Sequence, residues 1–218
     1  HIRNMKKIIY LITIALISVS SLAVKAQNKS ENLLNEVSTK MSGFKNMYIE
    51  FSYVLINKEV DMKQEASGTV YTAGDKYNLA FMDNIFIYDS LNTYIILTED
   101  EEINIVDGNS DEDMLNPAKL LFFYKEGFTY EWSDLTTTNG KQIQHIKLIP
   151  IDSESEASHF ILGIDNKTKI IYSIKEVGNN GTVTVFSIQV FKANQDISKN
   201  LFIFDELKYK KENFTINK

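Results

Sequence analysis

The sequence has 218 residues, with 23 basic and 29 acidic side chains, many aromatic residues and no cysteine. The acidic excess and the lack of any basic cluster argue against nucleic acid or an anionic membrane surface as the main partner. Without cysteine, the chain can have neither a disulfide framework nor a cysteine for lipid attachment.

The N-terminal segment has the three parts of a secretory signal peptide. Two lysines follow Met5, an apolar run covers residues 8–19, and Val24-Lys25-Ala26 resembles a cleavage site. The apolar run is too short to span a bilayer. We expect residues 1–26 to be cleaved, with residues 1–4 upstream of the true start, and residues 27–218 to form a single exported domain. That domain would carry 19 basic and 29 acidic residues, a net charge of −10, and no arginine.

The first part of the exported chain changes its hydrophobic period from helix to strand. Apolar residues at spacings of three and four predict an amphipathic helix over residues 29–44. Strict alternation then predicts a strand over residues 47–55. Short strands separated by turn residues follow, which favours an antiparallel meander. We expect these further strands at 68–73, 76–81, 85–88, 94–98 and 103–106.

A second helix is predicted in the middle of the chain. Asn116-Pro117 is a favoured start, because asparagine caps a helix and proline suits its first position. The helix should run to about Glu126, end at Gly127 and be apolar on nearly all sides. Strands are expected again at 128–133, 141–149, 159–164, 169–177, 182–193 and 201–204. The pattern predicts a mainly β fold of the α+β class.

Sequence motifs for metal, cofactor or catalytic chemistry are missing. The acidic stretch 107–113 could supply oxygen ligands to calcium, but Glu112 and Ala118 stand where the EF-hand loop needs glycine and glutamate, which favours a solvated loop. His145 and His159 are not spaced as a metal-binding pair. We therefore expect no metal, no cofactor and no enzymatic activity. A secreted enzyme that uses a pair of carboxylates remains an alternative.

Several short motifs have a familiar order. Gly68-Thr69-Val70-Tyr71, the strand through Tyr77 and Leu79, the run Asn116-Pro117-Ala118-Lys119-Leu120-Leu121 and the closing Phe202-Ile203-Phe204 resemble the periplasmic outer-membrane lipoprotein carrier (LolA-like) family over essentially the whole exported chain. The resemblance implies an incomplete antiparallel β-barrel, a half-barrel, covered by two or more helices that enclose an apolar cavity.

The same resemblance implies a function and partners. Family members bind the acyl chains of lipoproteins, act as chaperones across the periplasm and deliver their cargo toward the outer membrane. The implied partners are acylated lipoproteins, an inner-membrane lipoprotein-release transporter and an outer-membrane acceptor. We expect a periplasmic monomer that acts in lipoprotein transport. The alternative is a carrier or sensor of another amphiphile, such as a fatty acid or glycolipid, on the same fold.

An acyl-chain carrier needs an apolar lining, because each exposed methylene costs about 0.8 kcal/mol. Alternating aromatic residues on strands also make ordinary cores, so the pattern alone leaves both interpretations open. The nearly all-apolar second helix favours a lid over a cavity. The predicted lining and lid residues are Leu34, Val37, Met41, Phe44, Phe51, Tyr53, Tyr77, Leu79, Phe81, Leu120, Leu121, Phe123 and Tyr124.

One position departs from the family pattern. Family members carry an arginine after the Gly-x-hydrophobic-aromatic strand, where it hydrogen-bonds the lid, and a proline follows it. Here these two positions hold Gly74 and Asp75. Lys76 is a candidate latch in place of the arginine, but it lacks the planar guanidinium. The favoured alternative is that Lys76 is a solvated turn residue.

Overall fold

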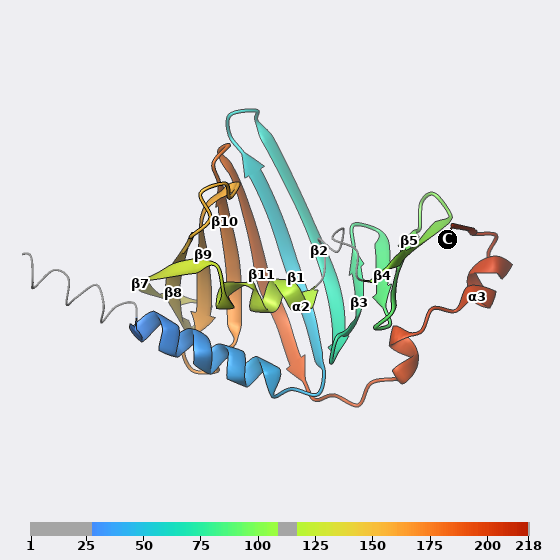
Figure 1. The fold of residues 1–218 in the computed structure, drawn as a ribbon, viewed down its shortest axis with the longest axis horizontal. Helices are drawn as coiled ribbons and strands as arrows, with labels where there is room; N and C mark the ends of the chain where they lie inside the picture. The colour runs from blue at the N-terminus through green and yellow to red at the C-terminus, as the bar shows by residue number, and fades with distance from the viewer. Residues whose placement is uncertain (1–27, 109–116, 218) are drawn as a thin grey trace, which may run out of the picture.

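The computed structural model describes residues 28–108 and 117–217, in which twelve strands form one open sheet (Figure 1). The strand order is β12-β6-β5-β4-β3-β2-β1-β11-β10-β9-β8-β7. Neighbours pair antiparallel, except β12 and β6, which are parallel. The expectation of a mainly β, mostly antiparallel sheet that does not close is confirmed. The strands are β1 (Met47–Asn57), β2 (Met62–Ala73), β3 (Lys76–Phe81), β4 (Asn84–Tyr88), β5 (Asn92–Leu97), β6 (Glu102–Asp107), β7 (Phe128–Thr138), β8 (Lys141–Pro150), β9 (Ala157–Asp165), β10 (Ile171–Gly178), β11 (Thr182–Ala193) and β12 (Thr215–Asn217).

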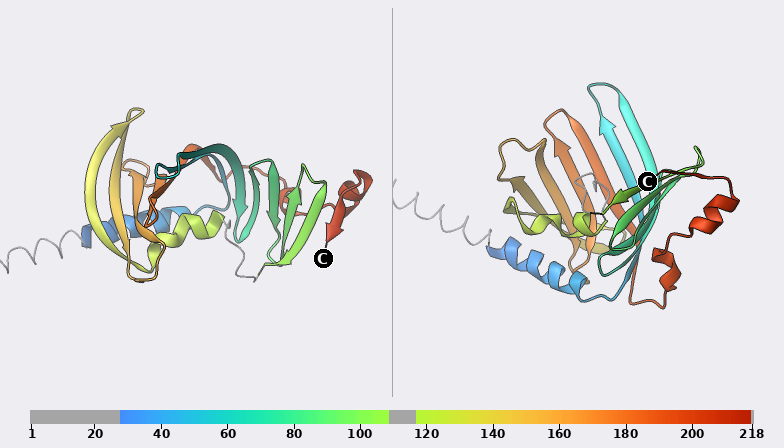
Figure 2. Two further views of the ribbon diagram at one scale, coloured as in Figure 1. Left: turned by 90° about the horizontal axis from the view of Figure 1, so that it is seen from above. Right: turned by 45° about the vertical axis from the view of Figure 1, so that its right-hand side comes forward.

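The helical segments are few and lie on both sides of the curved sheet. An N-terminal helix covers residues 28–42, and α2 (Pro117–Phe122) continues into the 3-10 helix η1 (Phe123–Lys125). The N-terminal helix and α2 lie on the concave side (Figure 2). A second 3-10 helix, η2 (Lys199–Phe202), and α3 (Glu206–Lys211) lie on the other side. No helix in the described part of the chain is long and apolar enough to cross a membrane.

The concave face carries the larger hydrophobic core. Strand residues that alternate along β1, β2 and β3 point to this face, and their cross-strand partners keep the same side, for example Ile49 opposite Val70 and Val70 opposite Leu79. The N-terminal helix adds its apolar stripe to this core. The ammonium of Lys29 lies 3.8 Å from the centre of the Trp132 ring on β7, which helps to fix the orientation of the helix.

The C-terminal segment covers the convex face of β4, β5 and β6. Tyr209 of α3 packs with Ile87, Ile96 and Ile103 in a second, smaller core. The Asn78 side-chain amide donates a 2.6 Å hydrogen bond to the Leu201 carbonyl oxygen, which ties η2 to β3. The chain then adds β12 to the edge of β6, so this edge strand is partly covered.

The secondary structure near the C-terminus differs from the sequence-based expectation. The strand predicted over 201–204 is wrong, because residues 199–202 form η2. The Ser198 hydroxyl accepts a hydrogen bond from the Asn200 amide and thereby caps this turn. Neither α3 nor β12 was predicted, and β2 starts six residues earlier than expected. The signal peptide and residues 109–113 of the acidic stretch lie outside the described residues.

Candidate functional site

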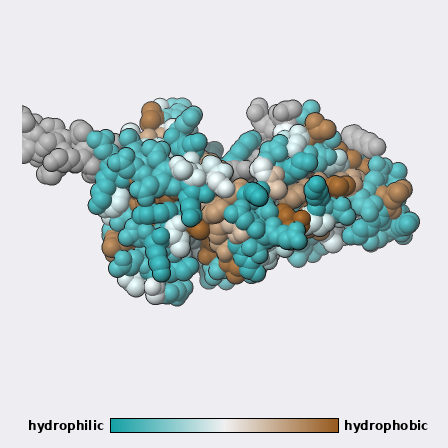
Figure 3. Space-filling view, turned by 90° about the horizontal axis from the view of Figure 1, so that it is seen from below, coloured by the Kyte–Doolittle hydropathy of each residue, from teal (hydrophilic) through white to brown (hydrophobic). Residues whose placement is uncertain are grey.

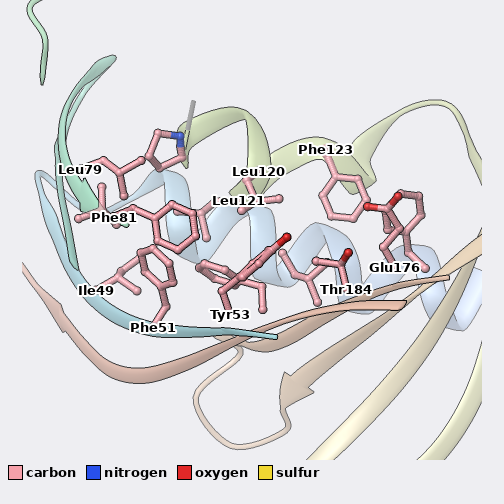
Figure 4. A pocket seen from close by; sticks show the side chains of 15 residues that line it. Ile49, Phe51, Tyr53, Leu79, Phe81, Leu120, Leu121, Phe123, Glu176 and Thr184 are labelled. Carbon is pink, nitrogen blue, oxygen red and sulfur yellow. The ribbon is translucent and has the colours of Figure 1, made fainter. Parts of the chain in front are cut away.

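An apolar pocket of about 240 Å³ lies between α2 and the concave face of the sheet (Figure 4). The strands form its floor, while α2 and η1 form its roof. The described residues of its lining are hydrophobic except for one carboxylate, one threonine and one tyrosine hydroxyl. The lining residues are Ile49, Phe51, Tyr53, Val70, Leu79, Phe81, Pro117, Leu120, Leu121, Phe123, Phe160, Ile174, Glu176, Thr184 and Phe186.

A glycine on β2 makes room for the aromatic floor. A Cβ atom at Gly68 would lie 2.4 Å from Cζ of Phe51 and 2.7 Å from the carbonyl oxygen of Ala80. The absence of a side chain therefore lets the Phe51 ring lie across β2. From there the ring packs on Phe81 and Phe186, with centroid separations of 5.5 and 4.6 Å. This close approach gives the glycine of the Gly-x-hydrophobic-aromatic strand a physical role.

The roof is anchored at its C-terminal end. Phe123 packs on Phe160 of β9 and on Phe128 of β7, with ring centroids 5.0 and 5.6 Å apart. The Tyr130 hydroxyl donates a hydrogen bond to the carbonyl oxygen of Tyr124 at 2.8 Å. At the other end, α2 packs on β2 and β3. Leu120 lines the pocket, yet 39% of its surface is exposed, so the roof covers the pocket incompletely.

The polar groups of the pocket lie together at one end. In Figure 4, Glu176, Thr184 and the Tyr53 hydroxyl lie away from Leu79 and Phe81. Glu176 of β10 pairs directly with Thr184 of β11, so both side chains leave the same face of the sheet. Burial raises the pKa of Glu176, and the Glu156 carboxylate raises it further. Burial also raises the pKa of Tyr53, whereas hydrogen bonding by Thr184 lowers it.

The structure brings seven of the thirteen predicted lining residues to the pocket: Phe51, Tyr53, Leu79, Phe81, Leu120, Leu121 and Phe123. The other six are not part of its lining. Leu34, Val37, Met41, Tyr77 and Tyr124 are buried in the core beside it, and Phe44 packs against that core. A binding role for the thirteen residues stays a prediction. The lining also includes residues that the sequence did not predict to line a cavity: Ile49, Val70, Pro117, Phe160, Ile174, Glu176, Thr184 and Phe186.

Tyr124 is one of the predicted lining residues that lie in the core instead. Its side chain has no exposed surface, and its hydroxyl lacks a partner with hydrogen-bond geometry. Burial raises its pKa strongly, although Ser38 of the N-terminal helix lowers it. Tyr124 therefore joins η1 to the N-terminal helix and acts as core packing in this arrangement.

The candidate latch lies in the β2–β3 turn. Gly74 has a φ of +61°, a left-handed conformation that suits glycine in a tight turn. Lys76 is half-buried at the start of β3. Burial alone would raise the pKa of the nearby Asp89, but hydrogen bonds from the Asn92 and Leu91 amides and the Tyr94 hydroxyl lower it, and the charge of Lys76 adds the smallest contribution. No contact between Lys76 and the roof is found in the described residues, so the latch remains a prediction.

Side chains that could bind a metal ion do not gather in the described ranges. No group of three or more His, Asp or Glu residues there has the geometry to hold a metal ion. His145 Nδ1 lies 3.6 Å from Oδ1 of Asp134, an isolated contact near the sheet edge. Among the described residues, Glu176 is the single carboxylate that lines the pocket, so the described part of the lining does not contain the pair of carboxylates that would favour an enzyme.

The outer surface contrasts with the pocket. Seen from below, it is largely hydrophilic, with hydrophobic atoms gathered near the middle and toward the right-hand end (Figure 3). A second hollow includes Glu50, Ser67, Asp83 and Gln189 in its lining and is more polar and more open than the pocket beneath α2. The apolar pocket is therefore the better candidate for a site that binds hydrocarbon.

Comparison with known proteins gives matches of fold. No family model matches the sequence, and no curated protein matches it. An uncharacterized conserved protein from Thermus thermophilus matches with a TM-score of 0.55 and 8% identity, over 87% of this chain and 98% of that one. The two proteins thus have a similar fold.

Two further solved structures are similar at lower scores. A putative outer membrane lipoprotein-sorting protein domain from Vibrio parahaemolyticus has a TM-score of 0.46 and 11% identity, over 84% of this chain and 99% of that one. A LolA superfamily protein from Nitrosomonas europaea has a TM-score of 0.42 and 6% identity, over 80% of this chain and 97% of that one. At these TM-scores and identities, the two likenesses assign no family and no role to this chain.

Proposed function

We propose that this protein is a periplasmic carrier that binds the acyl chains of lipoproteins beneath α2 and delivers them toward the outer membrane. The observation that carries the proposal is the apolar pocket between the helical roof and the concave sheet. The motifs that resemble the lipoprotein carrier family support the cargo class. An inner-membrane transporter and an outer-membrane acceptor would be its partners.

The energetics favour a hydrocarbon ligand. Sheltering a sixteen-carbon chain from water is worth on the order of 10 kcal/mol, at about 0.8 kcal/mol per methylene. The pocket offers aromatic and aliphatic surface from six strands and two helical segments along much of its length. Few polar groups would be desolvated when a chain enters, so most of the burial would contribute to affinity.

The size of the pocket argues for movement of the roof. At about 240 Å³ it lies below the roughly 300–1,000 Å³ of most ligand pockets. A long chain would therefore need α2 to move outward from the sheet. The Phe123 ring contacts and the Tyr130 hydrogen bond hold the C-terminal end of the roof, so we expect α2 to pivot about that end. Release of cargo would need the same outward movement of α2.

The proposal can be tested by crosslinking in cells. We would place a photoreactive phenylalanine at Leu120, which lines the pocket and is partly exposed, and label cellular lipoproteins with an alkyne fatty acid. Illumination should give crosslinked species that carry the alkyne label. The matched control is the same amino acid at Leu207 of α3, which is 71% exposed and distant from the pocket lining.

Crosslinking should depend on the acyl group of the lipoprotein as well as on the position of the crosslinker. A captured lipoprotein should disappear from the crosslinked species when its acylated cysteine is replaced by serine. Equal capture at Leu120 and Leu207, or capture that does not need the acyl group, would contradict the proposal.

A second candidate function is supported by the missing arginine and the small pocket. The position that holds the latch in the carrier family is Gly74 here, and no arginine follows residue 26. A carrier or sensor of a single-chain amphiphile would need neither a latch nor a large cavity. Mass spectrometry of lipid that co-purifies with the protein distinguishes the two: a single-chain lipid without peptide supports this candidate, and a triacylated peptide supports the lipoprotein carrier.

A further inference from the structure

We propose that Glu176, Thr184 and Tyr53 form a head-group site that binds a hydrogen-bond donor next to the hydrocarbon chain of the ligand and disfavours an anion. This inference rests on the proposed function, because it assumes that a chain occupies the pocket beneath α2. It specifies in addition which kind of polar head group the chain would carry. An amide N–H, a hydroxyl or an ammonium would fit, whereas a free carboxylate would not.

The position of Glu176 carries the argument. Its side chain stands on the same face of β10 as Ile174, two residues away, and both line the pocket. Cross-strand partners Thr184 on β11 and Phe160 on β9 flank it on that face. A carboxylate on the core-facing side of a strand is unusual, because apolar residues normally occupy that side.

No cation neutralises this carboxylate in the described chain. Glu176 forms neither an ion pair nor a side-chain hydrogen bond there, although the Glu65, Glu131 and Glu206 carboxylates each have a lysine within 4 Å. The neighbouring charge that acts on it is Glu156, which has the same sign. A half-buried carboxylate without a partner is destabilised, so a ligand that donates a hydrogen bond to it would relieve the cost of its burial.

The two hydroxyl groups complete a small polar surface. Glu176 and Thr184 are cross-strand neighbours on β10 and β11, and Tyr53 of β1 lines the same pocket. In Figure 4 the Tyr53 hydroxyl lies at the same end of the pocket as these two side chains. Hydroxyl groups can donate or accept, so they adapt to an amide or an alcohol. The hydrocarbon part of the same ligand would extend toward Leu79 and Phe81, at the apolar end of the pocket.

The test uses three probes with one chain length: a hexadecyl amine, a hexadecanoic amide and hexadecanoic acid. Dissociation constants would be measured at about pH 8, where an ordinary carboxylic acid is ionised. We expect the amine to bind tightest, the amide next and the acid weakest. In the Glu176→Gln variant, the preference for the amine over the acid should fall by about tenfold or more, since a hydrogen bond to a charged group is lost.

One control variant, one further test variant and a folding check accompany this experiment. Glu99→Gln removes the same charge from an exposed turn and should leave the preference unchanged. Tyr53→Phe keeps the aromatic ring, and it should weaken binding of the amide more than binding of the acid. Circular dichroism and thermal unfolding would confirm that the variants fold.

The outcomes for this inference and for the proposed function differ. If all three probes bind with equal affinity, or if Glu176→Gln leaves their order unchanged, the head-group site is wrong and the carrier function stands. If none of the probes binds the protein, the proposed function is wrong, and the head-group site falls with it.

Discussion

The two faces of the sheet are covered in different ways. On the concave side, α2 spans the strands and leaves a pocket whose roof includes the partly exposed Leu120. On the convex side of β4–β6, the C-terminal segment packs a row of aromatic rings onto the sheet. The ring centroids of Tyr94 and Phe204 lie 4.4 Å apart and those of Phe204 and Tyr209 5.5 Å apart, both stacked, and Phe214 meets Tyr209 edge-on at 5.2 Å.

Aromatic strand residues alone do not distinguish a filled core from a pocket. Both faces use alternating large side chains, and both are covered by a short helix. What separates them is how completely the covering segment fills the space above the sheet. Tyr209 fills that space on the convex side, whereas the roof on the concave side buries Leu121 and Tyr124 in the core and still leaves a pocket beside them. Variants of the two regions should therefore behave differently.

The largest effect is expected in the filled region. Tyr209→Ala would leave a cavity in the smaller core and should lower the free energy of unfolding by about 3 kcal/mol or more. Denaturant unfolding measures the loss. Binding of a hexadecyl probe at a temperature where the variant is folded should change less than about twofold. A large loss of affinity would show that the two regions do not act separately.

A smaller loss of stability, with an effect on the pocket, is expected at Gly68. Gly68→Ala places a Cβ against the Phe51 ring and the Ala80 carbonyl, so the ring must shift. We expect a loss of about 1–3 kcal/mol in unfolding free energy and weaker probe binding. Gly43→Ala is the matched control, because its Cβ would meet nothing closer than 3.4 Å. Equal effects of the two substitutions would contradict this role for Gly68.

Filling the pocket should separate binding from stability. Leu120→Trp adds bulk at a partly exposed lining position, so we expect at least a tenfold loss of probe affinity, about 1.4 kcal/mol, with a smaller change in unfolding free energy. Leu207→Trp makes the same exchange on α3. Isothermal titration on both variants checks the prediction, which is wrong if Leu207→Trp reduces the affinity as much.

The smallest effect concerns the charge at the polar end. The pKa of Glu176 is raised above its ordinary value of 4.5, first by burial and then by Glu156, so its ionised form destabilises the fold. Protonated Glu176 contributes its full stabilisation of the folded state below pH 4.5, and this contribution is lost as the pH rises through the raised pKa. Glu176→Gln should therefore have a higher Tm than the unchanged protein near neutral pH, and this difference should shrink on acidification. A Tm difference that is the same at all pH values would contradict the assignment.

Local patterns predicted much of the fold. The strands 76–81 and 182–193 were predicted with their observed bounds, because their alternation ends at turn residues. The C-terminal region was missed for a nonlocal reason, since β12 pairs with β6 more than a hundred residues earlier. A local signal for α3 was present in the Asp205 side chain, which accepts a hydrogen bond from the Lys208 amide, and in the Glu206–Lys210 pair.

The site was predicted less completely than the fold. The apolar stripe of the N-terminal helix was correctly placed on one face, but sequence cannot tell whether such a stripe fills a core or lines a pocket, and Val37 and Met41 fill the core. The polar end of the pocket could have been found from the sequence. Glu176 shares its strand face with Ile174, and a carboxylate at such a position marks either an error in the assigned face or a site.

The most direct measurement is to map where a bound chain lies. A hexadecanoic amide with a photoreactive group near the end of its chain would be bound, illuminated and located by peptide mass spectrometry. The account predicts labels on β1, β3 and α2, at residues such as Phe51, Phe81 and Leu120, and fewer labels in the Leu120→Trp variant. Labels spread over exposed hydrophobic residues such as Leu91, Leu135 and Leu207, unchanged in that variant, would contradict it.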